Sequence, residues 1–348
     1  VSLEDKLGIH GSPTAVLAFG DNGGAIGELV GEENRGIEYM FTMMNNARLS
    51  IGVQGLAIAE RAYQQARAYA RMRVQGRAVD GTGSGAVPII RHPDVRRMLL
   101  TMRAQIAAMR ALVYFTAGAI DRAKRHPSKT ERTRQQALAD LLIPVAKAWC
   151  TDTGCAVAST ALQVHGGTGF IEETGAAQHY RDARITPIYE GTNGIQAIDL
   201  LGRKLARDDG KALRALLALT RQTIDALAAS DDDSLRRIHA GLRGGASTLR
   251  QASRTLLDTW QRDKARALAG ASPYLTLFGV VAGGWLLAKG ALAAQRRLAG
   301  GQGDAAWLAA QLTLARFYAE NLLPQATGLA TMALAGSDSV LTISEDQL

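Results

Sequence analysis

A carboxylate, Glu190, stands beside a glycine just before a predicted helix, in the run Tyr189-Glu190-Gly191-Thr192-Asn193. Such a carboxylate can act as a base toward a ligand, because Gly191 lets the backbone pass close to a substrate. Thr192 or Asn193 can cap the helix and present its N-terminal amides to an anion. The same spacing also fits a plain carboxylate favoured by the helix dipole. Residue types and spacing alone leave both interpretations open.

A glycine cluster upstream is the second candidate feature. Gly166, Gly167 and Gly169 follow a long predicted helix, and glycine adopts backbone conformations that other residues avoid. Such a turn can expose N–H groups to the phosphates or carbonyls of a ligand. Taken alone, a glycine cluster of this kind is more often a simple turn.

The elements that must position these residues are long helices. Apolar residues recur at helical spacing over residues 36–73, 93–124 and 130–160, whereas residues 76–90 form a glycine-rich loop in this interpretation. Pro93 suits the first turn of the second helix, where its missing N–H costs nothing. Long helices with short connections predict an antiparallel bundle.

The two ends of the chain differ from this middle part. Residues 1–35 hold short apolar runs between glycines, which predicts the end of a truncated β-domain. The chain starts at Val1 with no signal peptide in view, so we expect a truncated start and a cytoplasmic protein. Residues 209–348 are rich in Leu, Ala and Arg and predict an appended helical domain, with 36–208 as the central bundle.

Within the tail, three short segments are predicted to interrupt the helices: 231–233, 244–245 and 300–301. Asp233 or Ser234 would suit a helix N-cap. Residues 271–288 reach the length of a membrane span, but they contain proline, serine, threonine and three glycines. They therefore predict a buried or oligomer-interface helix and no membrane span.

The formal charge of +8 is spread along the chain: residues 209–348 hold 15 Lys/Arg and 12 Asp/Glu, leaving +5 for residues 1–208. No basic run reaches five residues, which disfavours nucleic-acid binding and indicates solvated helix faces, part of them available to an anion such as CoA. Cys150 and Cys155, five apart on a helix, point in different directions. They predict core thiols in a reducing compartment, with no metal site.

The segment 163–196 resembles the acyl-CoA dehydrogenase family, whose members carry a glutamine-plus-glycine turn and then a Tyr-Glu-Gly-Thr motif. Order and separation match, with Arg181-Asp182 between the motifs. The resemblance extends over Lys6-Leu7-Gly8, Ser12-Pro13-Thr14 and Asn45-Asn46-Ala47-Arg48, covering about residues 1–205. It implies a mainly α fold, the family's helical bundle preceded by the remnant of its β-domain. The tail resembles the extra C-terminal helical domain of the family's longer members.

The resemblance also implies roles for individual residues. Glu190 matches the catalytic base, and Gly191 lies beside the thioester. The implied substrate-binding residues are Asn45, Asn46, Ala47, Arg48 and Gly191, with Arg48 facing an anionic or polar part of the ligand. The implied FAD-binding residues are Arg73, Val74, Gln75, Gln163, Val164, His165, Gly166, Gly167, Thr192, Asn193 and Gly194. In the family, the stretch that matches residues 73–75 contacts the FAD of the neighbouring subunit, and its motif is one residue shorter in this sequence. His92 matches a position near the cofactor in some relatives, and a structural role at the start of a helix is the alternative.

The implied activity is FAD-dependent dehydrogenation of an acyl-CoA to a trans-2-enoyl-CoA. The acyl-CoA is 3-methylmercaptopropionyl-CoA or a fatty acyl-CoA, electron-transfer flavoprotein is the acceptor, and the assembly is a homodimer or homotetramer. Burial of Glu190 beside an acyl chain would raise its pKa toward that of a useful base. An acyl-CoA oxidase, a nucleic-acid-binding flavoprotein and a non-catalytic scaffold are the alternatives. We expect the 348-residue chain by itself to bind FAD poorly.

Overall fold

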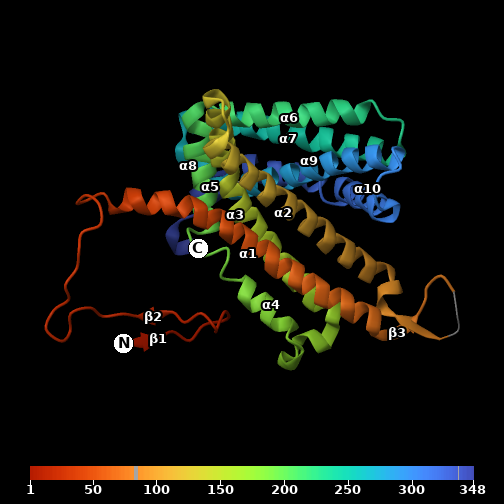
Figure 1. Cartoon of the computed structure of the whole chain (residues 1–348), viewed down its shortest axis with the longest axis horizontal. Helices are drawn as coiled ribbons and strands as arrows, with labels where there is room; N and C mark the ends of the chain where they lie inside the picture. Colours follow the sequence, from red (N-terminus) through yellow and green to blue (C-terminus); the bar gives the residue numbers. More distant parts are fainter. Residues whose placement is uncertain (82–84, 336) are drawn as a thin grey trace.

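Three long helices form the bundle that carries the site: α1 (Gly36–Met72), α2 (Pro93–Arg125) and α3 (Lys129–His165) (Figure 1). The computed structural model describes residues 1–81, 85–335 and 337–348, and leaves aside the side chains of residues 41, 42, 45 and 337. Consecutive helices run antiparallel, so α1 and α3 are parallel to one another. The predicted helical bundle is confirmed.

Glycines bring α1 and α3 into close contact. A Cβ on Gly52 would lie 2.8 Å from the Ala146 carbonyl oxygen, and one on Gly55 would lie 2.6 Å from that of Cys150. Only glycine leaves room for backbones this close. This approach places the middle of α3, which holds Lys147, directly against α1.

Two short hairpins accompany the bundle. Residues 76–90 were predicted to form a loop, but parts of this segment belong to a hairpin. In it, β3 (Val74–Arg77) pairs antiparallel with β4 (Ala86–Pro88). Residues 82–84 between them lie outside the described residues. The hairpin is stabilised from α2, because the His92 Nε2 lies 2.7 Å from the Gln75 carbonyl oxygen. At the N-terminus, β1 (Ser2–Leu3) pairs with β2 (Ala15–Val16).

The N-terminal hairpin contacts the rest of the molecule through α4 (Ala176–Ala183). The Ile9 N–H donates to the Asp182 Oδ1 at 2.6 Å. A Cβ on Gly8 would lie 2.7 Å from the same oxygen, so the chain passes Asp182 closely at this point. After α4 come α5 (Asn193–Ile198) and a π-helix, Asp199–Leu205.

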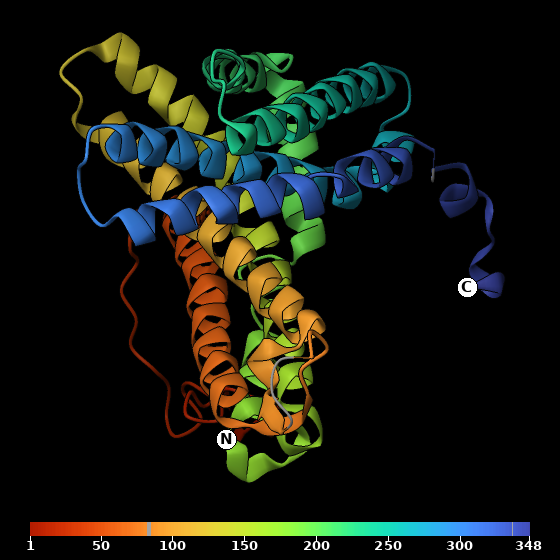
Figure 2. The ribbon, with the colours of Figure 1, turned by 90° about the vertical axis from the view of Figure 1, so that its right-hand side faces the viewer.

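The tail forms a second layer of helices across the end of the bundle (Figure 2). Its helices are α6 (Lys211–Ala228), α7 (Asp233–Arg262), α8 (Lys264–Ala269), α9 (Ala271–Ala299), α10 (Ala305–Asn321), α11 (Gln325–Ala335) and α12 (Ser337–Thr342). Two predictions need correction. Asp232 caps α7 by accepting from the Leu235 N–H at 2.9 Å, one residue before the predicted cap. Gly244 and Gly245 lie inside α7, where Gly245 packs against Leu323 rather than breaking the helix.

Helix α9 is the central element of the tail and contacts α2, α3, α5, α7, α10 and α11. Among the described residues it is the one helix long and apolar enough to cross a membrane by length and composition. However, 72% of its most apolar window is buried inside the protein. The buried helix predicted at 271–288 therefore serves as packing between the tail and the bundle.

Candidate active site

Glu190 lies on a tight loop between α4 and α5. The backbone has positive φ at two successive residues, 56° at Glu190 and 84° at Gly191. Residues other than glycine are uncommon in this region, and those that adopt it cluster at functional sites. The Asn193 N–H donates to the Pro187 carbonyl at 2.9 Å and closes the loop. The conformation of Glu190 is therefore one that its surroundings must hold in place.

Lys147 on α3 supplies part of that support. Its Nζ donates to the Gly191 carbonyl at 2.9 Å and to the Asn193 Oδ1 at 2.9 Å. The side chain is fully buried. Burial lowers the pKa of Lys147 to about 8; the carboxylates of Asp152 and Glu190 oppose the shift, and Arg48 adds to it. An ammonium group therefore lies behind the loop that carries Glu190.

The Asn193 amide, predicted to contact the cofactor, ties the loop to α3. Its Nδ2 donates to the Asp152 Oδ1 at 2.7 Å, to the Thr151 Oγ1 at 3.0 Å and to the Ala148 carbonyl at 3.1 Å. Burial raises the pKa of Asp152, and the hydrogen bond from Asn193 opposes the shift. Both ends of the amide are thus occupied within the chain.

Gln196 explains why residue 191 is glycine. Its Nε2 donates to the Gly191 carbonyl at 3.2 Å and to that of Glu190 at 3.4 Å. A Cβ at Gly191 would lie 2.9 Å from this nitrogen, and the positive φ adds a further penalty. Thr192 caps α5, as the sequence suggested, because its Oγ1 accepts from the Ile195 N–H at 3.3 Å.

Tyr189 connects the loop to α1. Its hydroxyl is hydrogen-bonded to the Gln54 Oε1. Burial raises the pKa of Tyr189, and the neighbouring Glu190 carboxylate adds to this. The loop is thus held from α1 through Tyr189, from α3 through Lys147 and from α5 through Gln196.

Arg48 is buried and forms an ion pair with Asp199 at 3.2 Å. Its Nη2 lies 3.9 Å from the point where a Cβ on Gly191 would sit, so the pair forms the wall behind the loop. Both side chains border a cavity of about 490 Å³ that Trp260 of α7 also lines. The sequence predicted Arg48 as a contact for an anionic or polar part of the ligand; the structure gives it Asp199 as a partner within the chain.

Sequence reasoning missed Lys147, Asp199 and Gln196. A signal for the first two exists, because each is a charged residue inside an apolar stretch: Lys147 lies in Ile143–Cys150 and Asp199 in Ala197–Leu201. Buried charges are rare unless they are paired. The partners, however, lie between 44 and 151 residues away and become visible only in the fold.

The remaining predicted substrate residues lie on α1 ahead of Arg48. Ala47 is partly buried and Asn46 is exposed, with its carbonyl accepting from the Ser50 hydroxyl at 3.2 Å. The side chain of Asn45 lies outside the described residues. All three therefore lie within one helical turn of the buried Arg48–Asp199 pair.

The other predicted FAD residues gather at the far end of α1 and α3. Gln163, Gly166 and Gly167 are exposed, whereas Val164 and His165 are buried. The His165 ring lies 4.6 Å from that of Tyr69 on α1, centroid to centroid. Arg73, Val74 and Gln75 follow Tyr69 and are exposed on the hairpin. His92 bonds this hairpin and so has a structural role.

The predicted residues thus form two groups at different levels of the bundle. One surrounds Glu190 and includes the Thr192-Asn193-Gly194 segment, which borders a cavity of about 410 Å³. The other comprises Gln163–Gly167 and Arg73–Gln75. From Lys147 to Gln163 is sixteen residues of α3, about 24 Å at a rise of about 1.5 Å per residue. A ligand contacting both groups in one chain would have to span this length.

Fold and site together define the C-terminal part of a flavoenzyme family. Residues 34–205 match the family described as acyl-CoA dehydrogenase, C-terminal domain, and residues 216–344 match the one described as acetyl-CoA dehydrogenase C-terminal like. The chain belongs to the acyl-CoA dehydrogenase family.

Individual relatives share this organisation. The 3-methylmercaptopropionyl-CoA dehydrogenase of Ruegeria pomeroyi is 48% identical over 99% of the chain and 58% of its own length. A broad-specificity linear acyl-CoA dehydrogenase of Mycobacterium tuberculosis is 31% identical over 99% of the chain and 58% of its own length. The chain therefore spans less than two thirds of these relatives.

Solved structures show the same fold. Caenorhabditis elegans ACDH-11, in complex with C11-CoA, superposes with a TM-score of 0.75 at 22% identity, over 93% of this chain and 50% of that one. An acyl-CoA dehydrogenase from Bacillus anthracis, complexed with FAD, gives 0.74 at 20% identity, over 100% of this chain and 60% of that one. Both include the tail as well as the bundle.

Proposed function

We propose that the protein dehydrogenates an acyl-CoA thioester between its α- and β-carbons, with Glu190 as the base. The observation that carries the proposal is the support of the Glu190–Gly191 backbone at positive φ by Lys147, Gln196 and Tyr189. A loop held from three helices fixes a carboxylate better than a simple helix start requires. The names of the relatives supply the thioester chemistry.

The residues of this chain act as follows in the proposed reaction. The Glu190 carboxylate accepts the α-proton, which the thioester carbonyl acidifies. Lys147 and Gln196 hold the Gly191 carbonyl, so the backbone next to Glu190 keeps its conformation while the carboxylate gains a proton. The Lys147 ammonium also lowers the local negative charge before the proton arrives.

FAD is the proposed cofactor, and when bound it would supply the acceptor for the β-hydride. The residues fit this in one respect: Gly166, at φ 61°, and Gly167 have open space where a Cβ would stand, and both are exposed. A glycine turn of this kind lets a large ligand approach the backbone. Gln163–Gly167 and Arg73–Gln75 would hold it at one end of the bundle, and Thr192–Gly194 at the other.

The proposed substrate is an acyl-CoA with a short or linear acyl chain. The names of the two relatives point to a thioether acyl group, 3-methylmercaptopropionyl, and to linear acyl groups. Identity is higher to the first, so 3-methylmercaptopropionyl-CoA is the first compound to test. We further propose that electron-transfer flavoprotein accepts the electrons and that the protein forms a homo-oligomer. Its proposed place is in fatty acid metabolism in the cytoplasm.

The test is anaerobic bleaching of the flavin absorbance in the full-length protein on addition of acyl-CoA. Thioether, short and long linear chains are compared. We expect bleaching with at least one of them, and its loss in Glu190→Gln, which keeps the size of the side chain but removes the base. Glu345→Gln, at an exposed glutamate near the end of the tail, is the matched control and should still bleach. Normal bleaching by Glu190→Gln would overturn the assignment of the base. Oxygen consumption without an added acceptor would indicate an oxidase instead.

A further inference from the structure

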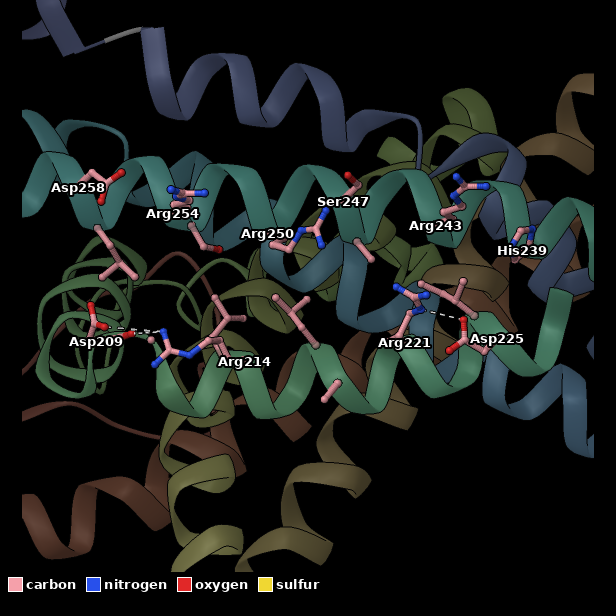
Figure 3. Close-up of a pocket in the computed structure, with 18 residues that line it drawn as sticks. Asp209, Arg214, Arg221, Asp225, His239, Arg243, Ser247, Arg250, Arg254 and Asp258 are labelled. Carbon is pink, nitrogen blue, oxygen red and sulfur yellow. Dashed lines mark hydrogen bonds and ion pairs between the residues drawn. The ribbon is translucent and has the colours of Figure 1, made fainter.

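A groove lies between α6 and α7, in the second layer of helices, and Figure 3 shows the residues that line it. Its volume is about 930 Å³, at the upper end of the range for small-molecule sites. The residues proposed to act in catalysis do not line it. The dehydrogenase proposal therefore leaves the groove without a role.

Arginines dominate the walls of this groove. Five of them line it from both helices, against three aspartates: Arg214, Arg221, Arg243, Arg250 and Arg254, with Asp209, Asp225 and Asp258. The excess is two positive charges, before His239 is counted. The charged side chains that line the groove thus give it a net positive charge.

Two of the arginines already have partners. Arg214 donates to the Asp209 carbonyl at 2.5 Å, and Arg221 donates to the Asp225 carboxylate at 2.8 Å (Figure 3). No ion pair or hydrogen bond within the described part of the chain involves the guanidinium groups of Arg243, Arg250 and Arg254. These three are the groups available to a ligand.

The three available arginines share one side of α7. Their spacings of seven and four residues keep them on a single stripe of the helix. From Arg243 to Arg254 the stripe extends about 16 Å along the axis. Guanidinium groups match phosphate oxygens with paired hydrogen bonds, so this stripe suits more than one phosphate group.

The floor of the groove is apolar. Leu213 and Ile224 of α6 are buried there, and Leu217 and Leu257 are partly exposed to the groove. A ligand that bears only phosphate would leave the apolar floor exposed to solvent. A ligand with a ring or a short apolar part would cover it and gain from the burial.

Acidic residues limit the length of the ligand. Asp209 and Asp258 lie at one end of the groove, and Asp225 lies toward the other (Figure 3). Beyond Asp225, the turn that joins the two helices carries Asp231 and Asp232. A nucleic acid or a membrane surface would extend over these carboxylates and be repelled. A compact anion would remain between them.

We propose that this groove binds a compact phosphate-bearing molecule with a ring or short apolar part, of the nucleotide class. Arg243, Arg250 and Arg254 contact the phosphates, and the leucines of the floor cover the organic part. The site is separate from the Glu190 loop and does not depend on the proposed dehydrogenase activity.

The test is calorimetric titration of the FAD-saturated protein with ADP, CoA and inorganic pyrophosphate. We expect ADP and CoA to bind more tightly than pyrophosphate, because they cover the floor. Arg250→Gln and Arg254→Gln should each weaken binding about tenfold, as expected for the loss of a charge-assisted bond. Arg262→Gln removes the same charge from α7 outside the groove and should leave the affinity unchanged. Asp258→Asn should strengthen binding, because it removes a carboxylate from the groove.

Three results would overturn the proposal. One is the absence of saturable binding of all three probes at millimolar concentration. Another is binding that Arg250→Gln, Arg254→Gln and Arg262→Gln leave equally strong, which would place the site elsewhere. The last is binding of duplex DNA or of anionic phosphatidylserine vesicles that requires Arg250 and Arg254 while the small probes fail to bind, which would assign the groove to a macromolecule or membrane.

Discussion

The Glu190 loop is held by one residue nearby in sequence and by one that is remote from it. The Gly191 carbonyl accepts from both Lys147 and Gln196, at 2.9 and 3.2 Å. Buried acceptors with two donors are well satisfied, whereas loss of one donor leaves the other to hold the loop alone. Substitutions at Lys147 should therefore affect the loop before they affect the bundle.

Lys147→Met tests this directly. The loop should open more often, so the amides of residues 189–196 should exchange hydrogen faster, by about tenfold for the loss of about 1.4 kcal/mol. Hydrogen exchange read by mass spectrometry checks this. Lys129→Met, at an exposed lysine of the same helix, is the matched control. Equal exchange in all three proteins would show that Lys147 does not hold the loop.

The same variant has a pH signature. The pKa of Lys147 is about 8 in the folded protein and about 10.5 in the unfolded chain. Between these values the unfolded chain binds more protons, so the free energy of unfolding gains a contribution that rises with pH. Lys147→Met lacks that contribution. Urea unfolding at pH 7.5 and 9.5 should show a smaller rise, or a steeper fall, in the variant than in the parent protein.

The Arg48–Asp199 pair yields a stability prediction. Both side chains are almost fully buried, at 6% and 5% exposure. Asp199→Ala strands the Arg48 guanidinium and should lower the free energy of unfolding by about 3–5 kcal/mol. Asp225→Ala breaks an exposed pair with Arg221 and should change it by less than about 1 kcal/mol. Similar small losses in both variants, measured by urea unfolding, would contradict the buried pair.

At this scale the sequence singled out Glu190 as the candidate base but did not indicate which residues support its loop. The Tyr-Glu-Gly-Thr run is local and therefore readable, and the role that the resemblance implies for Glu190 stays a prediction. Lys147 and Asp199 act through contacts across α1, α3 and the π-helix. Their partners depend on the parallel approach of α1 and α3, which no local pattern specifies.

At the scale of elements, α9 depends on small residues. A Cβ on Gly279 would lie 2.6 Å from the Trp149 Cδ1, and one on Gly283 would lie 3.0 Å from the Ala108 Cβ. These two glycines let α9 lie directly on α2 and α3. These contacts confirm that the segment forms a buried helix, one of the two outcomes predicted for residues 271–288.

Gly279→Ala should therefore destabilise the protein although alanine favours helices. The methyl group would overlap the ring of Trp149, which is buried in the hydrophobic core, and we expect a loss of about 2–3 kcal/mol. Gly290→Ala, in the same helix with no atoms within 4 Å, should instead stabilise by up to about 1 kcal/mol. The midpoint temperature of thermal unfolding, measured for both variants, tests this prediction. A change of the same sign in both variants would contradict the described packing of Gly279 on Trp149.

Helices and strands could be predicted where the apolar pattern repeats over a long segment, and they could not where the segment is short. The predictions for residues 36–73, 93–124 and 130–160 matched helices because the pattern repeats over about nine to ten turns in each. The β3–β4 hairpin escaped because it has three to four residues per strand and an irregular register between Val74 and Arg77. Gly244 and Gly245 were misleading for another reason: both lie inside α7, and Gly245 packs against Leu323 there.

At the scale of the whole molecule, the bundle and the tail share one hydrophobic core. Trp149 of α3 packs on Gly279 of α9, and Phe115 of α2 packs edge-on against Trp285 at 5.2 Å. The boundary predicted at 208–209 stays a prediction about domains. The bundle and the tail each cover apolar surface of the other. We therefore expect a substitution that destabilises one of them to destabilise the other.

This shared core has a consequence for how the chain is made. Helix α3 ends at His165, and α9, which covers it, ends at Ala299, 134 residues later. At about 5–20 residues per second, the ribosome needs roughly 7–27 s to synthesise that interval. Throughout it the faces of α2 and α3 that α9 covers in the folded protein are still without that cover. The nascent bundle therefore presents a target for chaperones until its cover emerges.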